Sequence, residues 1–261
     1  MDIVAVDWSG ARDGATRHIW AAQVRAGSLT DLRCGRTRDE VIDDLVSLRD
    51  ASVNGLTVGL DFSFSLPAWF LRQQGHASVG DLWAQMAREG EGWLVACETP
   101  FWGRPGRGRP DLPAHLRQAE SRARVNGIGA KSTFQIGGAG AVGTGSLRGM
   151  PHLMTLRRAG FTIWPFDPPS PWTVVEIYPR LLTGPVHKRN REARVRYLDH
   201  ASWDIPAPFR DCMDKSEDAF DTGIAALVMD AHAPELRALV PATDPVTLLE
   251  GDIWSPRTIA A

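Results

Sequence analysis

The sequence has few of the features that mark disulfide-bonded, zinc-finger or membrane proteins. Its three cysteines, Cys34, Cys97 and Cys212, are scattered and form no Cys-x-x-Cys pair. This usage argues for reduced thiols and against a structural zinc site. No apolar run approaches the roughly 20 residues of a membrane helix, and no basic-then-apolar leader opens the chain. We therefore expect a soluble, cytoplasmic protein with no membrane partner.

The sequence also lacks an excess of charge of one sign. With 29 Lys and Arg against 31 Asp and Glu, its formal net charge is −2. Nucleic acid would therefore have to bind at a local basic patch. Three catalytic signatures are missing too: His-Glu-x-x-His, Gly-x-Ser-x-Gly, and a phosphate loop, because Ala130 stands where that loop needs glycine before Lys131.

The order of apolar segments predicts an α/β protein. Strands are expected at 2–7, 17–24, 29–34, 56–62, 161–165 and 174–177, and helices at 38–48, 66–74, 79–89, 115–124, 150–159, 189–198 and 216–231. The first three strands form an antiparallel meander, and the remaining order fits a mixed sheet with helices on both faces. We interpret residues 1–261 as a single domain with a helical and loop insertion at roughly 64–150, after the fourth strand.

Carboxylates at the ends of these segments carry the chemical signal. Asp7 and Asp61 end two strands, Glu176 is near the end of a third, and Asp218 and Asp221 share one face of the last long helix. Parallel neighbours lie about 4.8 Å apart, and ligands of open α/β sheets bind beyond the carboxyl ends of the strands. Clustered carboxylates repel one another unless a cation joins them, and Mg²⁺ or Mn²⁺ prefers such oxygen ligands.

Each acid also has a structural interpretation. Asp7 and Asp61 can accept backbone hydrogen bonds in Asx turns, and Asp218 suits the first turn of a helix. Glu176 can pair with an arginine. Asp221 is harder to explain in this way, because it borders the buried face of its helix.

Basic residues supply candidate phosphate contacts. Arg104, Arg107 and Arg109 lie in a loop rich in glycine and proline, and Lys131 follows it. We predict that these four bind substrate phosphates. A second basic stretch, from Lys188 to Arg196, is interpreted as a solvated surface.

Five segments resemble one known family. "VDWSGA", "VGLDFSFSLP", "VVEIYPRL", "EDAFDTGIAALV" and "EGDIWSP" are similar, in order, to motifs of the family called domain of unknown function 429, grouped as predicted nucleases with a ribonuclease-H-like fold. The resemblance extends from Val6 to Trp254. It implies a five-stranded mixed sheet with the order 3-2-1-4-5.

The resemblance also implies a set of site residues. Ribonuclease-H-like nucleases place acids on strand 1, on strand 4 and on the last helix, which correspond here to Asp7, Asp61 and Asp221. Asp218 lies one turn earlier, as in relatives that resolve Holliday junctions, and Glu176 falls in a family segment with no assigned role.

The resulting hypothesis is a metal-dependent phosphodiesterase, most simply a nuclease acting on DNA or RNA. Asp7, Asp61 and Asp221 would hold Mg²⁺ or Mn²⁺, with Asp218 and Glu176 as an auxiliary ligand or base. Two alternatives remain open: an ATP-dependent phosphotransferase of the actin and sugar-kinase type, and a binding module without catalytic activity.

Overall fold

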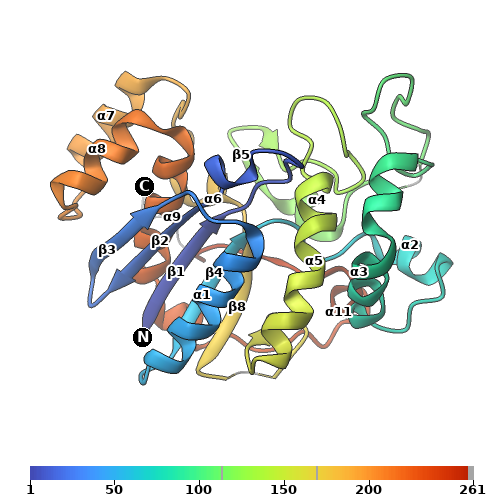
Figure 1. The fold of residues 1–261 in the computed structure, drawn as a ribbon, viewed down its shortest axis with the longest axis horizontal. Helices are drawn as coiled ribbons and strands as arrows, with labels where there is room; N and C mark the ends of the chain where they lie inside the picture. The colour runs from blue at the N-terminus through green and yellow to red at the C-terminus, as the bar shows by residue number, and fades with distance from the viewer. Residues whose placement is uncertain (113, 169, 258–261) are drawn as a thin grey trace.

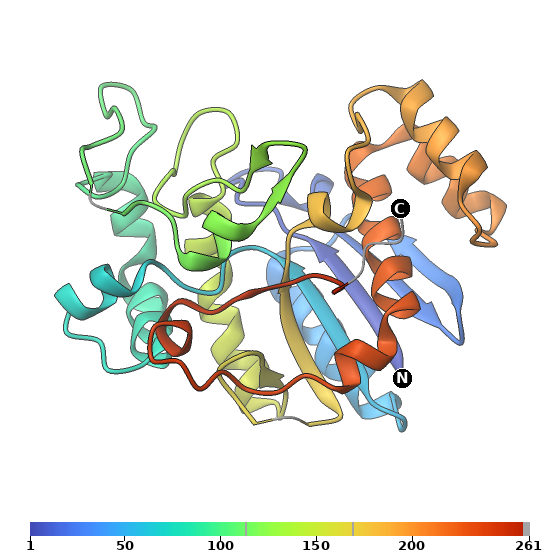
Figure 2. The ribbon, with the colours of Figure 1, turned by 180° about the vertical axis from the view of Figure 1, so that it is seen from behind.

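A mixed sheet of seven strands forms the centre of the molecule, with helices on both faces (Figures 1 and 2). The computed structural model describes residues 1–112, 114–168 and 170–257. The sheet strands are β1 (Asp2–Asp7), β2 (Trp20–Arg25), β3 (Ser28–Arg33), β4 (Leu56–Asp61), β7 (Thr162–Ile163), β8 (Trp172–Ile177) and β9 (Ile253–Trp254). A separate hairpin contains β5 (Arg124–Val125) and β6 (Ile128–Gly129). The α/β class predicted from the sequence is therefore confirmed.

The direction of the strands defines one edge of the sheet. Their order is β3-β2-β1-β4-β8-β7, and β9 also pairs with β8. β2 runs antiparallel to β1 and β3, whereas β1, β4, β7, β8 and β9 are parallel. The carboxyl ends of β1, β4 and β8 consequently lie at the same edge, where ligands of α/β sheets bind.

Eleven α-helices surround the sheet within the described part of the chain. They are α1 (Arg38–Ala51), α2 (Ala68–Gln73), α3 (Val79–Ala96), α4 (Gln118–Arg122), α5 (Gly143–Arg158), α6 (Pro179–Thr183), α7 (Arg191–His200), α8 (Ala207–Lys215), α9 (Glu217–Ala231), α10 (Ala233–Arg237) and α11 (Thr247–Glu250). None of these helices is both long and apolar enough to cross a membrane.

Alternation along the strands fills two hydrophobic cores, one on each face of the sheet. Ile3 and Ala5 of β1 belong to the core that α9 covers, and Val4 and Val6 belong to the core beneath α1, α3 and α5. Figure 1 shows α1 and α5 in front of the sheet, and Figure 2 shows α9 on the opposite face. An acid at the end of a strand therefore faces one core or the other according to its position in the alternation.

The glycine-rich segment differs most from its prediction. We expected the next helix to begin at residue 150, but α5 begins at Gly143. Glycine disfavours helices, so the sequence pattern concealed the first turns. Packing explains the glycines: a Cβ on Gly143 would lie 2.1 Å from the carbonyl oxygen of Thr133, and one on Gly149 would lie 2.6 Å from the Phe62 ring. α5 can reach the sheet only because these side chains are missing.

Candidate functional site

Two parallel strands bring Asp7 and Asp61 side by side. Asp7 ends β1, Asp61 ends β4, and the two residues are directly opposite in the strand register. Since Asp7 follows Ile3 and Ala5 in the alternation, both aspartates project toward the face that α9 covers. Both side chains are half-buried. The proximity predicted from the sequence is thus present in the structure.

The first turns of α9 bring two more acids to this edge. Ser216 is the N-cap of α9, and its hydroxyl accepts a hydrogen bond from the Ala219 amide. Asp221, only 4% exposed, belongs to the buried side of α9. Asp218 is one turn earlier, where its Oδ2 lies 3.6 Å from Nδ1 of His18. α9 therefore contributes Asp221 to the interior of the site and Asp218 to its rim.

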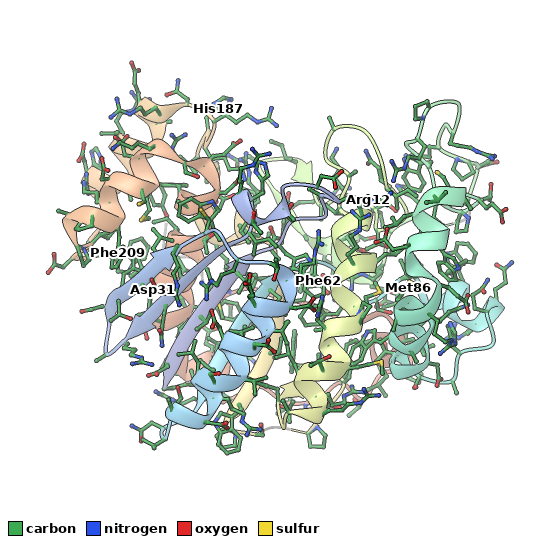
Figure 3. The ribbon with its side chains drawn as sticks, in the orientation of Figure 1. Arg12, Asp31, Phe62, Met86, His187 and Phe209 are labelled. Carbon is green, nitrogen blue, oxygen red and sulfur yellow. The ribbon has the colours of Figure 1, made fainter. Side chains whose placement is uncertain are left out.

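One lysine lies among these acids. The Nζ of Lys188 donates a hydrogen bond to Oδ2 of Asp221, and the two groups form an ion pair. Lys188 belongs to the loop between α6 and α7, next to His187, which Figure 3 labels. We call Asp7, Asp61, Asp221 and Lys188 the aspartate cluster.

The electrostatics of the aspartate cluster favour an added cation. Burial and, to a lesser extent, the charge of Asp221 raise the pKa of Asp61 to about 8, against the opposing effect of Lys188. Burial and the charges of Asp61, Asp218 and Asp221 raise the pKa of Asp7 well above its ordinary value. Burial lowers the pKa of Lys188, but the three aspartates outweigh this effect and raise it. A single positive charge, that of Lys188, thus offsets three carboxylates that repel one another.

Acceptor atoms of the cluster remain unfilled. Oδ1 of Asp221 is buried without a hydrogen-bond partner, and the described residues donate no side-chain hydrogen bond to Asp7 or Asp61. Three carboxylates are suitable donors for Mg²⁺ or Mn²⁺. Within the described ranges, however, no three His, Cys, Asp or Glu residues form a ready-made metal-binding group. The donor chemistry fits a divalent cation, and the side chains would have to rearrange to enclose one.

Glu176 lies apart from these aspartates, on the other face of the sheet. It pairs in register with Leu60, one position before Asp61, and therefore projects toward the core that α5 covers. There Arg117 donates hydrogen bonds to both of its carboxylate oxygens. The arginine partner, one of the two interpretations of Glu176, is the one that the structure shows.

Arg117 organises a second cluster of acids. Its side chain is 0% exposed and also contacts Glu120, with its Nη2 2.5 Å from Oε1 of that residue, and the carbonyl oxygen of Glu250. The Glu250 carboxylate accepts from the amides of Ala68 and Gln118, at 2.8 Å each. We call Arg117, Glu120, Glu176 and Glu250 the arginine cluster. Every carboxylate oxygen in it accepts a hydrogen bond.

Two cavities adjoin Asp61. The Lys188 cavity, of about 490 Å³, is lined by acids and bases together: Asp61, Asp221, Lys188, Arg180, His187 and Arg189 are among its residues. The Lys131 cavity, of about 150 Å³, lies between Asp61 and the arginine cluster, and its lining includes Lys131, Gly10 and Gly145. Tyr178 lines both cavities. The carboxyl edge of the sheet is therefore accessible from two sides of Asp61.

The predicted phosphate-binding residues divide into two groups. Lys131 lines a cavity together with Asp61. Arg104, Arg107 and Arg109 are exposed in the loop before α4 and line neither cavity. Lys131 is thus the one of the four that the fold brings to the carboxylates.

The second basic stretch contains site residues that the sequence argument assigned to a solvated surface. Lys188 contacts Asp221, and Arg194 is buried, donating hydrogen bonds to the carbonyl oxygens of Met213, Lys188 and Asp214. Arg117 received no role at all. A usable signal was present: Asp221 borders an apolar face, and a buried acid requires a basic partner.

Comparisons with known proteins add no family to these observations. No protein-family model matches the sequence, and no curated protein or solved structure shows significant similarity to the chain.

Proposed function

We propose that this protein is a divalent-metal-dependent phosphodiesterase, and that its substrate is DNA or RNA. One observation carries the proposal: β1, β4 and α9 bring Asp7, Asp61 and Asp221 to one edge of the sheet, with unfilled acceptor atoms and too few basic partners. Most buried acceptor atoms in folded proteins accept a hydrogen bond.

Asp7, Asp61 and Asp221 would hold Mg²⁺ or Mn²⁺. When bound, such an ion supplies the activation of water and the stabilisation of the leaving oxygen in phosphodiester hydrolysis. Asp218, at the rim of the site, adds negative charge that strengthens cation binding. Both carboxylate oxygens of Glu176 accept hydrogen bonds from Arg117. Glu176 would therefore assist the metal site only indirectly, through Asp61 on the neighbouring strand.

The rim of the Lys188 cavity supports a phosphate-bearing substrate. Arg180, His187 and Arg189 line this cavity together with Asp61 and Asp221, so an anion that binds there has basic side chains beside the carboxylates. Burial and the charge of Asp61 raise the pKa of Tyr178. Its hydroxyl consequently stays protonated at neutral pH and can donate a hydrogen bond to a phosphate oxygen.

The strand order adds support of a weaker kind. The sheet has seven strands rather than the five implied by the resemblance to ribonuclease-H-like nucleases, because β7 and β9 both pair with β8, but the series β3-β2-β1-β4-β8 is compatible with the implied 3-2-1-4-5 order. A fold does not determine an activity, so the residues of the site carry the argument.

A phosphotransferase is the second candidate. The turn after β1 lies against the first turn of α5, where a Cβ on Gly10 would be 2.5 Å from the Gly145 amide nitrogen. This close approach places backbone amides beside the Lys131 cavity, and such amides can bind the phosphates of a nucleotide. ATP binding without cleavage of nucleic acid would favour this candidate.

The test is cleavage of a panel of labelled substrates in Mg²⁺ or Mn²⁺: single-stranded, duplex and branched DNA, and RNA. We expect metal-dependent cleavage of at least one substrate, and a loss of about 10²-fold or more in the Asp61→Asn variant. Asp43→Asn is the matched control, because Asp43 is exposed on α1, which covers the opposite face of the sheet from the aspartate cluster.

Calorimetry provides the second measurement. We expect Mn²⁺ to bind to the wild type and to Asp43→Asn, but not to Asp7→Asn. Absence of both cleavage and Mn²⁺ binding, with and without oligonucleotide, would rule out the proposed function.

A further inference from the structure

Lys188 is the basic partner of the aspartate cluster, and its ion pair has a consequence for metal binding. We propose that Lys188 serves as an internal cation that occupies the cluster in the resting protein and leaves Asp221 when a divalent cation binds. This inference rests on the proposed function, since it concerns the same site. In this role Lys188 competes with the metal ion for Asp221, which the sequence did not suggest.

The contacts single out Lys188 among the basic residues. Within the part of the chain that the structure describes, it alone among lysines and arginines forms an ion pair with Asp7, Asp61 or Asp221. Its neighbour Arg189 points elsewhere: its Nε lies 3.9 Å from Oε2 of Glu217, and its side chain is 82% exposed. The two residues are adjacent in the chain but differ in their relation to the cluster.

The backbone around Lys188 is fixed, so the side chain is the part that can move. Its carbonyl oxygen accepts a hydrogen bond from Nη1 of the buried Arg194, which also binds two carbonyl oxygens at the end of α8. Its amide donates to the carbonyl oxygen of Val186 at 3.0 Å. These bonds fix the backbone of the loop against α8. They do not involve the four-carbon side chain of Lys188, which can therefore change its conformation.

The surroundings of the side chain provide space for this movement. Lys188 is 36% exposed and lines the cavity of about 490 Å³ that also reaches Asp61 and Asp221. Its ammonium group can therefore move from Asp221 into the cavity without displacing core side chains. Once released, it would remain on the basic rim, beside Arg180 and Arg189.

The exchange explains why three carboxylates share an edge without forming a ready-made metal site. Oδ2 of Asp221 is occupied by the ammonium group, and Oδ1 has no partner. A divalent cation that recruits both Asp221 and the strand aspartates must first break the Lys188 ion pair. The ion pair therefore lowers the affinity for metal and helps to keep the cluster folded in its absence.

Direct titration with Mn²⁺ tests this role. We would measure dissociation constants at pH 7.5 by calorimetry, and by electron paramagnetic resonance of free Mn²⁺, for the wild type, Lys188→Met, Lys188→Gln, Lys188→Arg and Arg189→Met. We expect Lys188→Met and Lys188→Gln to bind Mn²⁺ about tenfold or more tightly, because they remove the competing charge. Lys188→Arg should stay close to the wild type.

Arg189→Met is the matched control, because it removes one positive charge from the adjacent residue. Screening should limit its effect to less than about threefold. An equal gain in Mn²⁺ affinity in Lys188→Met and Arg189→Met would indicate a general effect of charge and would overturn the inference. So would unchanged affinity in Lys188→Met and Lys188→Gln while the wild type binds Mn²⁺, and the proposed function would then still stand. Absence of Mn²⁺ binding in every protein, Lys188→Met included, would instead refute the proposed function itself.

A footprinting experiment gives an independent readout in the wild type. Acetylation of lysine amines, followed by mass spectrometry, should show increased reactivity of Lys188 when Mg²⁺ is added. The increase should be missing in Asp7→Asn, and Lys131 should react equally with and without Mg²⁺. Unchanged reactivity of Lys188 in a protein that has bound Mg²⁺ would contradict the exchange.

Discussion

Two clusters of acids lie at the same edge of the sheet, on opposite faces, and differ in how their charges are balanced. In the arginine cluster, Arg117 and backbone amides fill every carboxylate oxygen. In the aspartate cluster, Lys188 contacts one of three carboxylates, and Oδ1 of Asp221 has no partner. Glu176 pairs with Leu60, one position before Asp61, so Glu176 and Asp61 project from opposite faces of the sheet.

This difference distinguishes a structural from a functional use of buried carboxylates. The arginine cluster joins segments that are far apart in the chain, since Arg117 bonds to Glu176 and to the Glu250 carbonyl. A closed network of this kind fixes a fold and leaves nothing for a ligand to bind. The aspartate cluster is partly exposed, and its carboxylates repel one another. Such unfilled and repelling groups are typical of sites that bind a ligand.

Removal of Arg117 should produce the largest effect on stability. The Arg117→Met variant leaves Glu120 and Glu176 buried without a counter-charge, and we expect a loss of about 3–5 kcal/mol in the free energy of unfolding. Lys188→Met should lose less than Arg117→Met, because Lys188 is partly exposed and pairs with one carboxylate, whereas the fully buried Arg117 pairs with two. Urea denaturation followed by tryptophan fluorescence measures both values.

The control for Arg117 is Arg122→Met, which removes an exposed ion pair with Asp252 close to the same segment. Its effect should be below about 1 kcal/mol. Equal losses in Arg117→Met and Arg122→Met would remove the distinction between the closed and the open cluster.

Sequence reasoning placed the three aspartates correctly and mistook their surroundings. Short apolar runs that end on a carboxylate identify β1 and β4, and in the parallel pair Asp7 lies directly opposite Asp61. The register between β4 and β8 is not encoded locally, so nothing in "VVEIYPRL" shows that Glu176 faces the other core. One position of shift places a side chain on the opposite face.

Sequence patterns do not identify Arg117 and Lys188 as partners of these acids, because tertiary packing sets these contacts too. Arg117 is 59 residues from Glu176 and 133 from Glu250, and such pairs are set by the packing of the inserted segment on the sheet. Lys188 stands in a run of basic residues whose composition is typical of a solvated surface. The turn that directs it toward Asp221 depends on Arg194, a residue whose burial only the tertiary structure reveals.

The pH dependence of the free energy of unfolding tests whether the charge of Asp61 lacks a sufficient partner in the aspartate cluster. The folded state raises the pKa of Asp61 from 3.8 to about 8, so the native protein retains a proton that the unfolded chain releases. The free energy of unfolding should therefore fall as pH rises from 4 toward 8 in the presence of a chelator. Asp61→Asn lacks this penalty. We expect this variant to be more stable than the wild type at pH 8 and about equally stable near pH 4.

The measurement is urea denaturation at pH 4, 6 and 8, with Asp43→Asn as the exposed control. Asp43→Asn should follow the wild type at each pH. A wild type that is more stable than Asp61→Asn at pH 8 without metal would show that the Asp61 carboxylate is already compensated in the folded state.

The smallest expected effect concerns Lys131, which lines the cavity between the two clusters. If substrate phosphates enter this cavity, Lys131→Met should weaken oligonucleotide binding by about five- to tenfold and lower the slope of log affinity against log salt by about one. Arg107→Met removes the same charge from an exposed loop outside both cavities, so its effect should stay below about twofold. Fluorescence anisotropy at several salt concentrations, in Ca²⁺ to prevent cleavage, separates the two variants. A larger effect for Arg107 would place the substrate along the arginine loop, whereas a larger effect for Lys131 places it beside Asp61, where the open cluster meets the closed one.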